Sequence, residues 1–576
     1  MQQYMREYYK KAKLNRKFVA HDLCIDSWES IQPYYHKLEH REFASAKDVE
    51  IWLLQRSELD AVLEEELAWR YIKMNGDTKN EQYAQHFTAF VEHIEPHVAA
   101  VENRLDKKLL QALQLHEIDK KKYFVFIRAL QKRDALFREK NIPIITELQK
   151  LEQKYGEIAS QMTVDVDGKT LTLQQASVFL KHTNRDTRKK VFLQIQERRL
   201  QDEQQLHSLL SELITKRHIC ALHADFENYR DYKFQDLGRF DYTKEDCFNF
   251  YDSIQKTIPP VLAYMYSKRK KSLQLAALKP WDLDVDPDNL PPLAPFKTSQ
   301  ELIQKTIACL HEIKPLYAEY IKTMVAEGYV DLESRIGKAP GGFNYPLYES
   351  NIPFIFMNAA GTLHDVVTML HEAGHAIHSC VTAELPLVEF KNLPSEVAEL
   401  ASMSMELISM EHWHHFFDTD AELKRAKRSQ LEGVISVLSW IVIIDKFQHW
   451  LYENPQHTVA EREKTWLNIL NDFDTKLVDW SDLMHIKKAS WQKQLHIFEV
   501  PFYYIEYGIA QLGAIALWRQ YIQNREQALE NYECFLRLGY TIPIPEIYAA
   551  AGIDFSFSLD YVTELIAFVQ QKLEEL

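Results

Sequence analysis

The sequence predicts a mainly α-helical protein. Glycine is scarce, with 15 among 576 residues, whereas average usage would give about forty. Leu, Glu, Lys and Gln, which favour helices, are abundant. Apolar residues recur at helical spacing over long stretches with charged faces between them, as in 48–70 and 105–130. With 46% hydrophobic residues, a chain of this length can bury a large core.

Taken in order, the chain divides into three regions. Residues 1–180 form an N-terminal helical region that ends with a predicted β-hairpin at 162–173, where an Asp-Gly turn joins two β-rich arms. Residues 181–298 are again helical and end in a Pro- and Asp-rich segment, 281–295, which we interpret as a linker. Residues 299–576 contain the motifs that carry chemistry. These regions can interleave into one body.

A predicted helix over 364–379 contains the motif His371-Glu-Ala-Gly-His375, which reads H-E-x-x-H. Residues four apart lie one above the other on a helix, so both imidazoles can reach one metal ion. Zinc accepts such ligands, and a catalytic zinc site uses three protein ligands and a water. Glu372 could then take the water's proton. A chance match is the alternative, so a third ligand is needed.

A second predicted helix, over 394–407, offers that ligand. Ser395 is the expected N-cap. Glu399 and Glu406 are seven residues apart and share one face, among apolar residues that disfavour a freely solvated stripe. One glutamate can bind the metal while the other orients a ligand histidine. The spacing alone does not distinguish the two roles.

These motifs resemble the thimet-oligopeptidase-like family of zinc metallopeptidases, and most closely its oligoendopeptidase F branch. The likeness includes the glycine-rich segment 337–343, the strand-like segment 352–358 and the His/Tyr segment 496–507. It is strong over roughly residues 330–520 and only general in the N-terminal half.

The resemblance implies a fold and a metal site. The expected fold is a large two-lobed helical ellipsoid with a deep central channel and a small β-sheet beside the zinc helix. One zinc ion would be held by His371, His375 and Glu399, with Glu406 supporting a ligand histidine and Glu372 acting as general base.

Four residues that precede the predicted zinc helix in the sequence are expected to bind substrate. Gly341 and Gly342 allow close approach of another chain. Phe354 and Phe356 lie in the segment 352–358, which could pair with an extended peptide if it is an edge strand. A short structural strand is the alternative, and the resemblance favours substrate binding.

The segment around Pro501 is expected to stabilise the reaction's oxyanion. A helix beginning near Pro501 would place Tyr504 and Tyr507 on one face, with Tyr503 close by. Pre-placed hydroxyl donors lower the barrier for attack on a carbonyl. The resemblance implies this role for Tyr504 and Tyr507 and substrate contact for His496. Tyr503 is a rival to Tyr504, and plain aromatic packing is the alternative.

Composition excludes several partners. A net charge of −15 argues against nucleic acid, because phosphate backbones bind clustered Lys and Arg.

The six cysteines are scattered, which is typical of reduced thiols in a cytosol. Residues 1–10 lack the apolar core of a signal peptide, and the longest apolar run, 433–444, is too short to span a bilayer. We expect a cytoplasmic protein without a membrane partner.

The predicted function is that of a zinc-dependent oligoendopeptidase that cuts internal bonds of short, unstructured peptides by a zinc-activated water. A helical zinc carboxypeptidase and a non-catalytic peptide-binding protein are the alternatives. Three further histidines, at 412, 414 and 415, are interpreted as surface or rim residues because nothing near them in sequence completes a ligand set.

Overall fold

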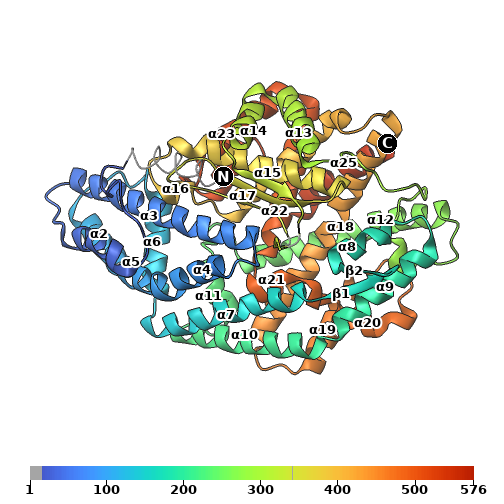
Figure 1. Ribbon diagram of the computed structural model, residues 1–576, viewed down its shortest axis with the longest axis horizontal. Helices are drawn as coiled ribbons and strands as arrows, with labels where there is room; N and C mark the ends of the chain where they lie inside the picture. The colour runs from blue at the N-terminus through green and yellow to red at the C-terminus, as the bar shows by residue number, and fades with distance from the viewer. Residues whose placement is uncertain (1–15, 336, 340) are drawn as a thin grey trace. The chain divides into compact units, whose positions relative to one another are not determined.

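The computed structural model describes residues 16–335, 337–339 and 341–576. The protein is mainly α-helical, as predicted. Its chain forms two compact units: the first contains residues up to 139, 295–423 and 513–555, and the second contains 140–294, 424–512 and 556–576 (Figure 1). Each unit is discontinuous in sequence, so the units do not follow the three consecutive regions 1–180, 181–298 and 299–576. One boundary, after residue 294, coincides with the end of the Pro- and Asp-rich segment.

The first unit contains most of the N-terminal helices and one three-stranded sheet. Its elements are α2 (Trp28–His40), α3 (Ala46–Gly76), α4 (Glu81–His93), α5 (Glu95–Leu115), α6 (Phe124–Leu136), α13 (Ser299–Ile313), α14 (Pro315–Ala326), β3 (Val330–Glu333), β4 (Phe343–Tyr345), β5 (Phe354–Ala359), α15 (Leu363–Val381), α16 (Val388–Lys391), α17 (Ser395–Ser409), α23 (Arg525–Leu538) and α24 (Ile544–Ala550). The 3-10 helix η5 (Met410–His415) follows α17 directly.

The second unit contains one β-hairpin among its helices. Its elements are α7 (Ile142–Ser160), β1 (Thr163–Val166), β2 (Lys169–Thr172), α8 (Leu173–Ser177), α9 (Arg185–Leu200), α10 (Glu203–His223), α11 (Tyr229–Asp236), α12 (Lys244–Ser272), α19 (Val459–Asp472), α20 (Met484–Ala489), α21 (Leu495–Glu499) and α25 (Leu559–Glu574). Two helices, α18 (Asp420–Glu453) and α22 (Tyr504–Gln523), contain residues of both units.

The N-terminal helices α2 to α6 share one hydrophobic core, which includes Leu38, Trp52, Leu105 and Leu130. The helix α3 begins where the Ser45 hydroxyl accepts a hydrogen bond from the backbone N–H of Asp48. Phe390 of α16 belongs to the same core, so this bundle packs against the segment that follows α15.

The three-stranded sheet has the order β3-β5-β4. β5 pairs in parallel with β3, where Val330 lies opposite Ile355, and antiparallel with β4, where Phe343 lies opposite Phe356. The expectation that segment 352–358 is an edge strand is therefore wrong. Its run of apolar residues reflects burial on both faces, because the consecutive side chains of Phe354 to Met357 are all buried.

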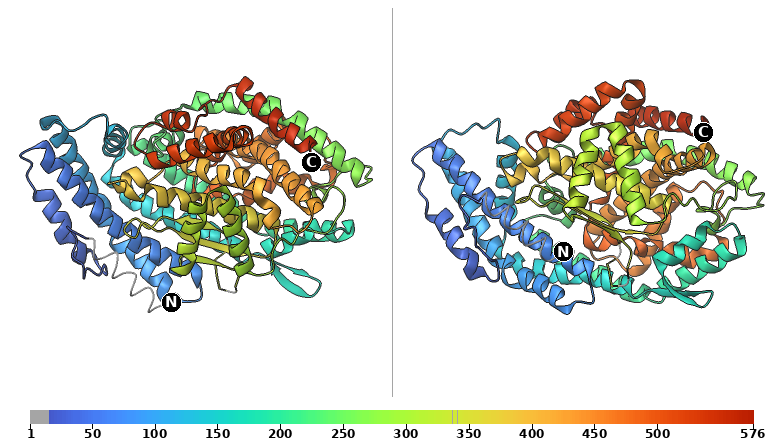
Figure 2. Two further views of the ribbon diagram at one scale, coloured as in Figure 1. Left: turned by 90° about the horizontal axis from the view of Figure 1, so that it is seen from above. Right: turned by 45° about the horizontal axis from the view of Figure 1, so that its top comes forward.

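The predicted hairpin is confirmed in the second unit. β1 pairs antiparallel with β2, and Thr163 lies opposite Thr172. Asp167 and Gly168 both have positive φ, 51° and 80°, as a two-residue hairpin turn requires. Figure 2 shows the two strands side by side.

The Pro- and Asp-rich segment is not a loose linker. Asp282 is completely buried, and its carboxylate is held by Arg185 at 2.7 Å and Arg188 at 3.0 Å, both on α9. Arg188 is 2% exposed. Paired guanidinium groups make the burial of this carboxylate tolerable, and they anchor the start of the segment to the second unit.

Among the described residues, no helix has both the length and the apolar character needed to cross a bilayer. The six cysteines all lie in the described part of the chain, and none forms a disulfide. The prediction that residues 1–10 lack the apolar core of a signal peptide concerns a segment outside the described residues.

Candidate active site

The H-E-x-x-H motif lies on α15, as predicted. The helix begins with a reciprocal cap, in which the Thr362 hydroxyl accepts from the Asp365 N–H and the Asp365 carboxylate accepts from the Thr362 N–H. Val366, Leu370 and Ile377 are fully buried on one side of the helix. This apolar stripe sets the rotation of α15 and so determines where its histidines point.

The second helix, α17, begins one residue earlier than its predicted cap implies. Pro394 occupies the N-cap position, and its carbonyl accepts hydrogen bonds from the N–H groups of Val397 at 2.9 Å and Ala398 at 3.0 Å. Ser395 is therefore the first helical residue, and the N-cap prediction for it is wrong. The proline carbonyl makes the first helical hydrogen bonds, so no hydroxyl cap is needed.

Close contact between α15 and α17 depends on Gly374 of the motif. A Cβ atom built on Gly374 would lie 2.6 Å from the Ser402 Cα and 2.9 Å from the Ala401 carbonyl oxygen. Both are backbone atoms and cannot rotate away. Only glycine therefore lets α15 approach the helix that carries the two glutamates.

We expect Gly374→Ala to lower the free energy of unfolding by about 1–3 kcal/mol, because the added methyl overpacks the helix contact. It should also weaken zinc binding, since α17 must move with Glu399. Calorimetric melting and metal titration measure both effects. Gly433→Ala is the matched control: this exposed helical glycine has no atom within 4 Å of its Cβ position, so the change should stabilise by about 0.5–1 kcal/mol. Equal melting of the two variants would contradict the packing role.

The structure brings the three predicted ligands together. The Glu399 Oε2 atom lies 3.3 Å from the His371 Nε2 and 3.6 Å from the His375 Nε2. Ligands bound tetrahedrally to zinc at ordinary bond lengths lie about 3.4 Å apart. The Ser402 hydroxyl donates to the same carboxylate oxygen at 3.1 Å. Two imidazole nitrogens and one carboxylate oxygen form a donor set that fits zinc.

The geometry also distinguishes the roles of Glu399 and Glu406, which the sequence spacing left open. The Glu406 Oε1 atom lies 2.7 Å from the His371 Nδ1, on the side of the ring away from Glu399. Glu406 thus orients His371 and favours the tautomer whose Nε2 is free to bind a metal. Glu399 is the glutamate near both Nε2 atoms.

Glu372 is 5% exposed, and its Oε2 atom makes no hydrogen bond to a described residue. Burial raises the pKa of this carboxyl to about 7; His371 opposes the rise, and the charges of Glu399 and Glu406 add to it. A hydrogen bond of 3.5 Å from the Asn344 side chain of β4 to the Glu372 carbonyl links the sheet to the helix. Asn344 is a site neighbour that sequence reasoning missed, because only the sheet brings it here.

We expect zinc binding near pH 7 to release at least about one proton. Burial lowers the pKa of His371, but the hydrogen bonds and charges of Glu399 and Glu406 outweigh it and raise this pKa well above its ordinary value. The metal-free imidazole is therefore protonated at neutral pH and must lose a proton to bind. Zinc affinity should consequently rise with pH. Calorimetric titration in buffers of different ionisation enthalpy measures the release, and identical heats in all buffers would contradict it.

The predicted His/Tyr group forms an aromatic cluster in the second unit. His496 lies on α21, and its ring centre is 4.7 Å from that of Tyr504 and 5.9 Å from that of Tyr507. Tyr503 is 5.3 Å from Tyr507. The helix α22 begins at Tyr504 rather than near Pro501. Tyr503 therefore lies just before the helix.

Four residues expected to bind substrate lie at or near the sheet. Gly341 has a φ of 103° and open space around its Cβ position, whereas a Cβ at Gly342 would lie 3.4 Å from the Phe356 carbonyl oxygen. Phe354 and Phe356 are 6% and 1% exposed. The Phe356 ring stacks on Phe343 at 4.6 Å, so these phenylalanine side chains pack in the sheet. Pro340 of the glycine-rich segment lies outside the described residues.

Comparison with known proteins identifies the family. Residues 178–565 match peptidase family M3, and residues 25–137 match the peptidase M3 N-terminal domain. The first match alone covers more than half of the chain. The chain therefore belongs to peptidase family M3. Within this family it is a metalloendopeptidase of the oligoendopeptidase F branch.

Relatives and a solved structure agree with this assignment. An oligoendopeptidase F homolog of Borreliella burgdorferi is 24% identical over 452 residues, which cover 76% of this chain and 74% of the relative. Oligopeptidase PepF of Bacillus subtilis is 24% identical over 424 residues, covering 72% of this chain and 61% of the relative. A structure of PZ peptidase A with an inhibitor has a TM-score of 0.90 at 23% identity, covering 98% of this chain and 99% of that one. At that identity, the structural likeness shows the fold.

Proposed function

We propose that this protein is a zinc-dependent oligoendopeptidase that hydrolyses internal bonds of short, unstructured peptides. The observation that carries the proposal is the convergence of His371, His375 and Glu399 beside the buried carboxyl of Glu372. Family M3 peptidases are generally zinc-dependent, and one ion would suit this donor set. The names of the relatives favour oligopeptides as substrates.

When bound, zinc lowers the pKa of a coordinated water and polarises the scissile carbonyl. Glu372 accepts the proton of the attacking water and returns it to the leaving amine. A carboxyl whose pKa has been raised by burial suits a group that both takes and gives a proton near neutral pH. Glu406 holds His371 in the orientation that ligation requires.

The tyrosines would act on the oxyanion. Tyr504 and Tyr507 donate hydrogen bonds to the developing negative charge, and His496 contacts the substrate. Burial raises the pKa of Tyr504 to about 12, so its phenol stays protonated and can donate at neutral pH. The family assignment and the clustering of these rings support the roles.

The substrate backbone would pair with β4 rather than with β5. Among the described strands, β4 has only one partner, so its outer edge keeps groups that can pair with an extended peptide. Gly341 and Gly342 lead directly into β4, and the open space around the Cβ position of Gly341 leaves room for a second chain there. We further propose a cytoplasmic location, which suits six cysteines without a disulfide.

The test is mass spectrometry of products from an unstructured peptide of about ten residues, a length that suits a ligand-sized cleft. Internal cuts by the zinc-loaded protein, absent from its Glu372→Gln variant, are the expected result. Stepwise loss of C-terminal residues would instead indicate a carboxypeptidase. Zinc and peptide binding without cleavage would make the protein a non-catalytic binder.

A further inference from the structure

A second group of histidines gathers around one carboxylate in the first unit. His412, His414 and His415 lie in η5, and Glu312 lies near the end of α13, 100 residues before His412. Contacts between α13 and η5 bring the two segments together. The sequence analysis found no ligand set for these histidines because this carboxylate is remote in the chain. His412 is moreover buried, with 8% of its surface exposed, so its interpretation as a surface or rim residue is wrong.

The distances in this group match those of a metal site. The Glu312 Oε1 atom lies 3.3 Å from the His414 Nε2 and 3.1 Å from the His415 Nε2. The corresponding distances around Glu399 are 3.3 and 3.6 Å. The donor types are also the same: two Nε2 atoms and one carboxylate oxygen. The His415 Nε2 is buried and makes no hydrogen bond to a described residue.

Two successive hydrogen bonds, through His412 to Tyr521, hold the Glu312 carboxylate on the side away from His414 and His415. The His412 Nδ1 lies 2.9 Å from the Glu312 Oε2, the oxygen that does not face the other two histidines. The His412 Nε2 lies 2.8 Å from the Tyr521 hydroxyl. The hydrogen bond from His412 leaves the Glu312 Oε1 atom directed toward His414 and His415.

We propose that Glu312, His414 and His415 form a second transition-metal site, suited to Zn²⁺ and similar cations that prefer imidazole and carboxylate ligands. Half of the His414 side chain is exposed, so water can complete the coordination. Glu312 supplies one negative charge, as Glu399 does in the first set. His412 and Tyr521 position the carboxylate in the way that outer partners of metal ligands do.

The proposed site connects two elements that frame the catalytic set. α13 contacts both α15 and α17, and η5 continues directly from α17, which carries Glu399. A metal bound to Glu312 and to η5 would join α13 to the end of α17. Because the unfolded chain does not hold these ligands together, binding should raise the melting temperature.

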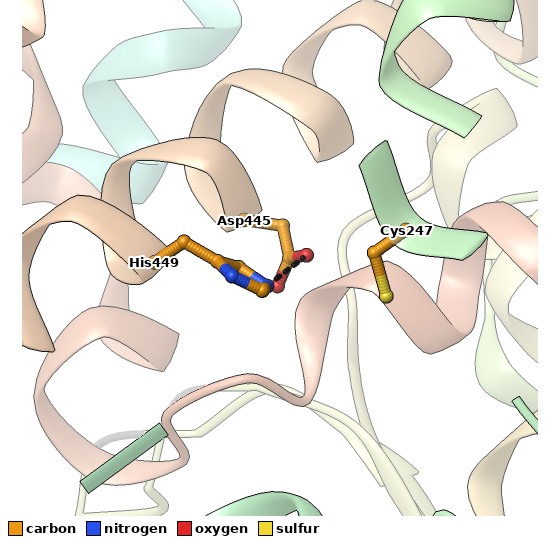
Figure 3. Close-up of side chains that lie close together, drawn as sticks. All are labelled: Cys247, Asp445 and His449. Atoms are coloured by element: carbon orange, nitrogen blue, oxygen red, sulfur yellow. Dashed lines mark ion pairs between the residues drawn. The ribbon is translucent and has the colours of Figure 1, made fainter. Parts of the chain in front are cut away.

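A buried group in the second unit fits a metal less well. Figure 3 shows Asp445 and His449 on α18 facing Cys247 of α12, with ligand atoms within 4.8 Å of one another. Burial lowers the pKa of His449, and the nearby cations Arg230 and Arg239 lower it further, against the opposing effect of Asp445. The same positive charges disfavour a divalent cation in this buried place. We assign this group to packing.

The experiment is calorimetric titration of the full chain, already loaded with one equivalent of zinc, with further Zn²⁺. We expect one additional equivalent to bind and to raise the melting temperature. Glu312→Gln and His414→Ala should each weaken this second binding by more than about 100-fold, since they remove a ligand. Tyr521→Phe keeps the ring but loses the hydroxyl, and should weaken it by about 10-fold.

His311→Ala is the matched control, because it removes an exposed histidine on the same helix that is outside the proposed ligand set. It should bind the second equivalent like the parent. Glu399→Gln should lose the first equivalent and keep the second, which separates this site from the catalytic one. Absence of a second equivalent in the parent would overturn the proposal. So would equal losses in His311→Ala and His414→Ala, and so would an undiminished second equivalent in Glu312→Gln.

Discussion

Glu372→Gln is expected to lower kcat by about 10²- to 10⁴-fold while zinc content stays at the parent's level. The substitution keeps the size of the side chain and removes its ability to accept a proton. Glu372 lies outside the ligand set, since Glu399 is the carboxylate beside both Nε2 atoms. The large effect follows because no other carboxylate of the site is left to act as base: Glu399 faces the ligand nitrogens and Glu406 is engaged with His371.

The measurement is initial cleavage rate of the ten-residue peptide at saturating substrate, with zinc determined by elemental analysis of the same samples. Glu384→Gln is the matched control, because it makes the same change at an exposed carboxylate just beyond α15. It should retain the parent's rate. Parent-like turnover by Glu372→Gln would remove this residue from the mechanism.

Tyr504→Phe and Tyr507→Phe are each expected to lower kcat by about 10²- to 10³-fold, because each removes one hydrogen-bond donor to the oxyanion. Phenylalanine preserves the ring contacts, which are 5.5 Å between the centres of these two tyrosines. Zinc affinity should not change, since neither residue is a proposed ligand. A loss in kcat with little change in KM would identify a contact made mainly in the transition state.

Tyr503→Phe is the matched control for these variants. Tyr503 precedes α22, whereas the other two tyrosines share its first turn. The cluster is otherwise similar around it, with its ring 5.3 Å from that of Tyr507. We expect the rate of Tyr503→Phe to remain within a few-fold of the parent. If Tyr503→Phe loses activity and Tyr504→Phe does not, Tyr503 is the donor; if all three remain active, the cluster serves packing.

Features that depend on neighbours along the chain were predictable from the sequence alone. Helical periodicity predicted α15 and α17, and the Asp-Gly turn predicted the β1–β2 hairpin. The H-E-x-x-H spacing placed His371 and His375 on one helical face. Local periodicity is sufficient here because a helix or a two-residue turn is specified by residues only a few positions apart. The resemblance to a family added the functional expectation.

Which of these features come into contact depends on the tertiary packing. Glu399 and Glu406 are equivalent in spacing, but the packing of α17 on α15 at Gly374 sets one beside both Nε2 atoms and the other behind His371. The run of apolar residues in β5 is compatible with an edge strand or a central strand. Its pairing with both β3 and β4 shows that it is central.

Tertiary packing also explains why the sequence analysis missed the division of the chain into two units and the carboxylate of the second histidine group. Each compact unit combines three separate stretches of sequence, and Glu312 reaches His414 only because α13 packs against η5. Such contacts depend on how buried faces fit across long separations in the chain. Local residue patterns do not predict which buried faces pack together, because one apolar face can pack against many partners.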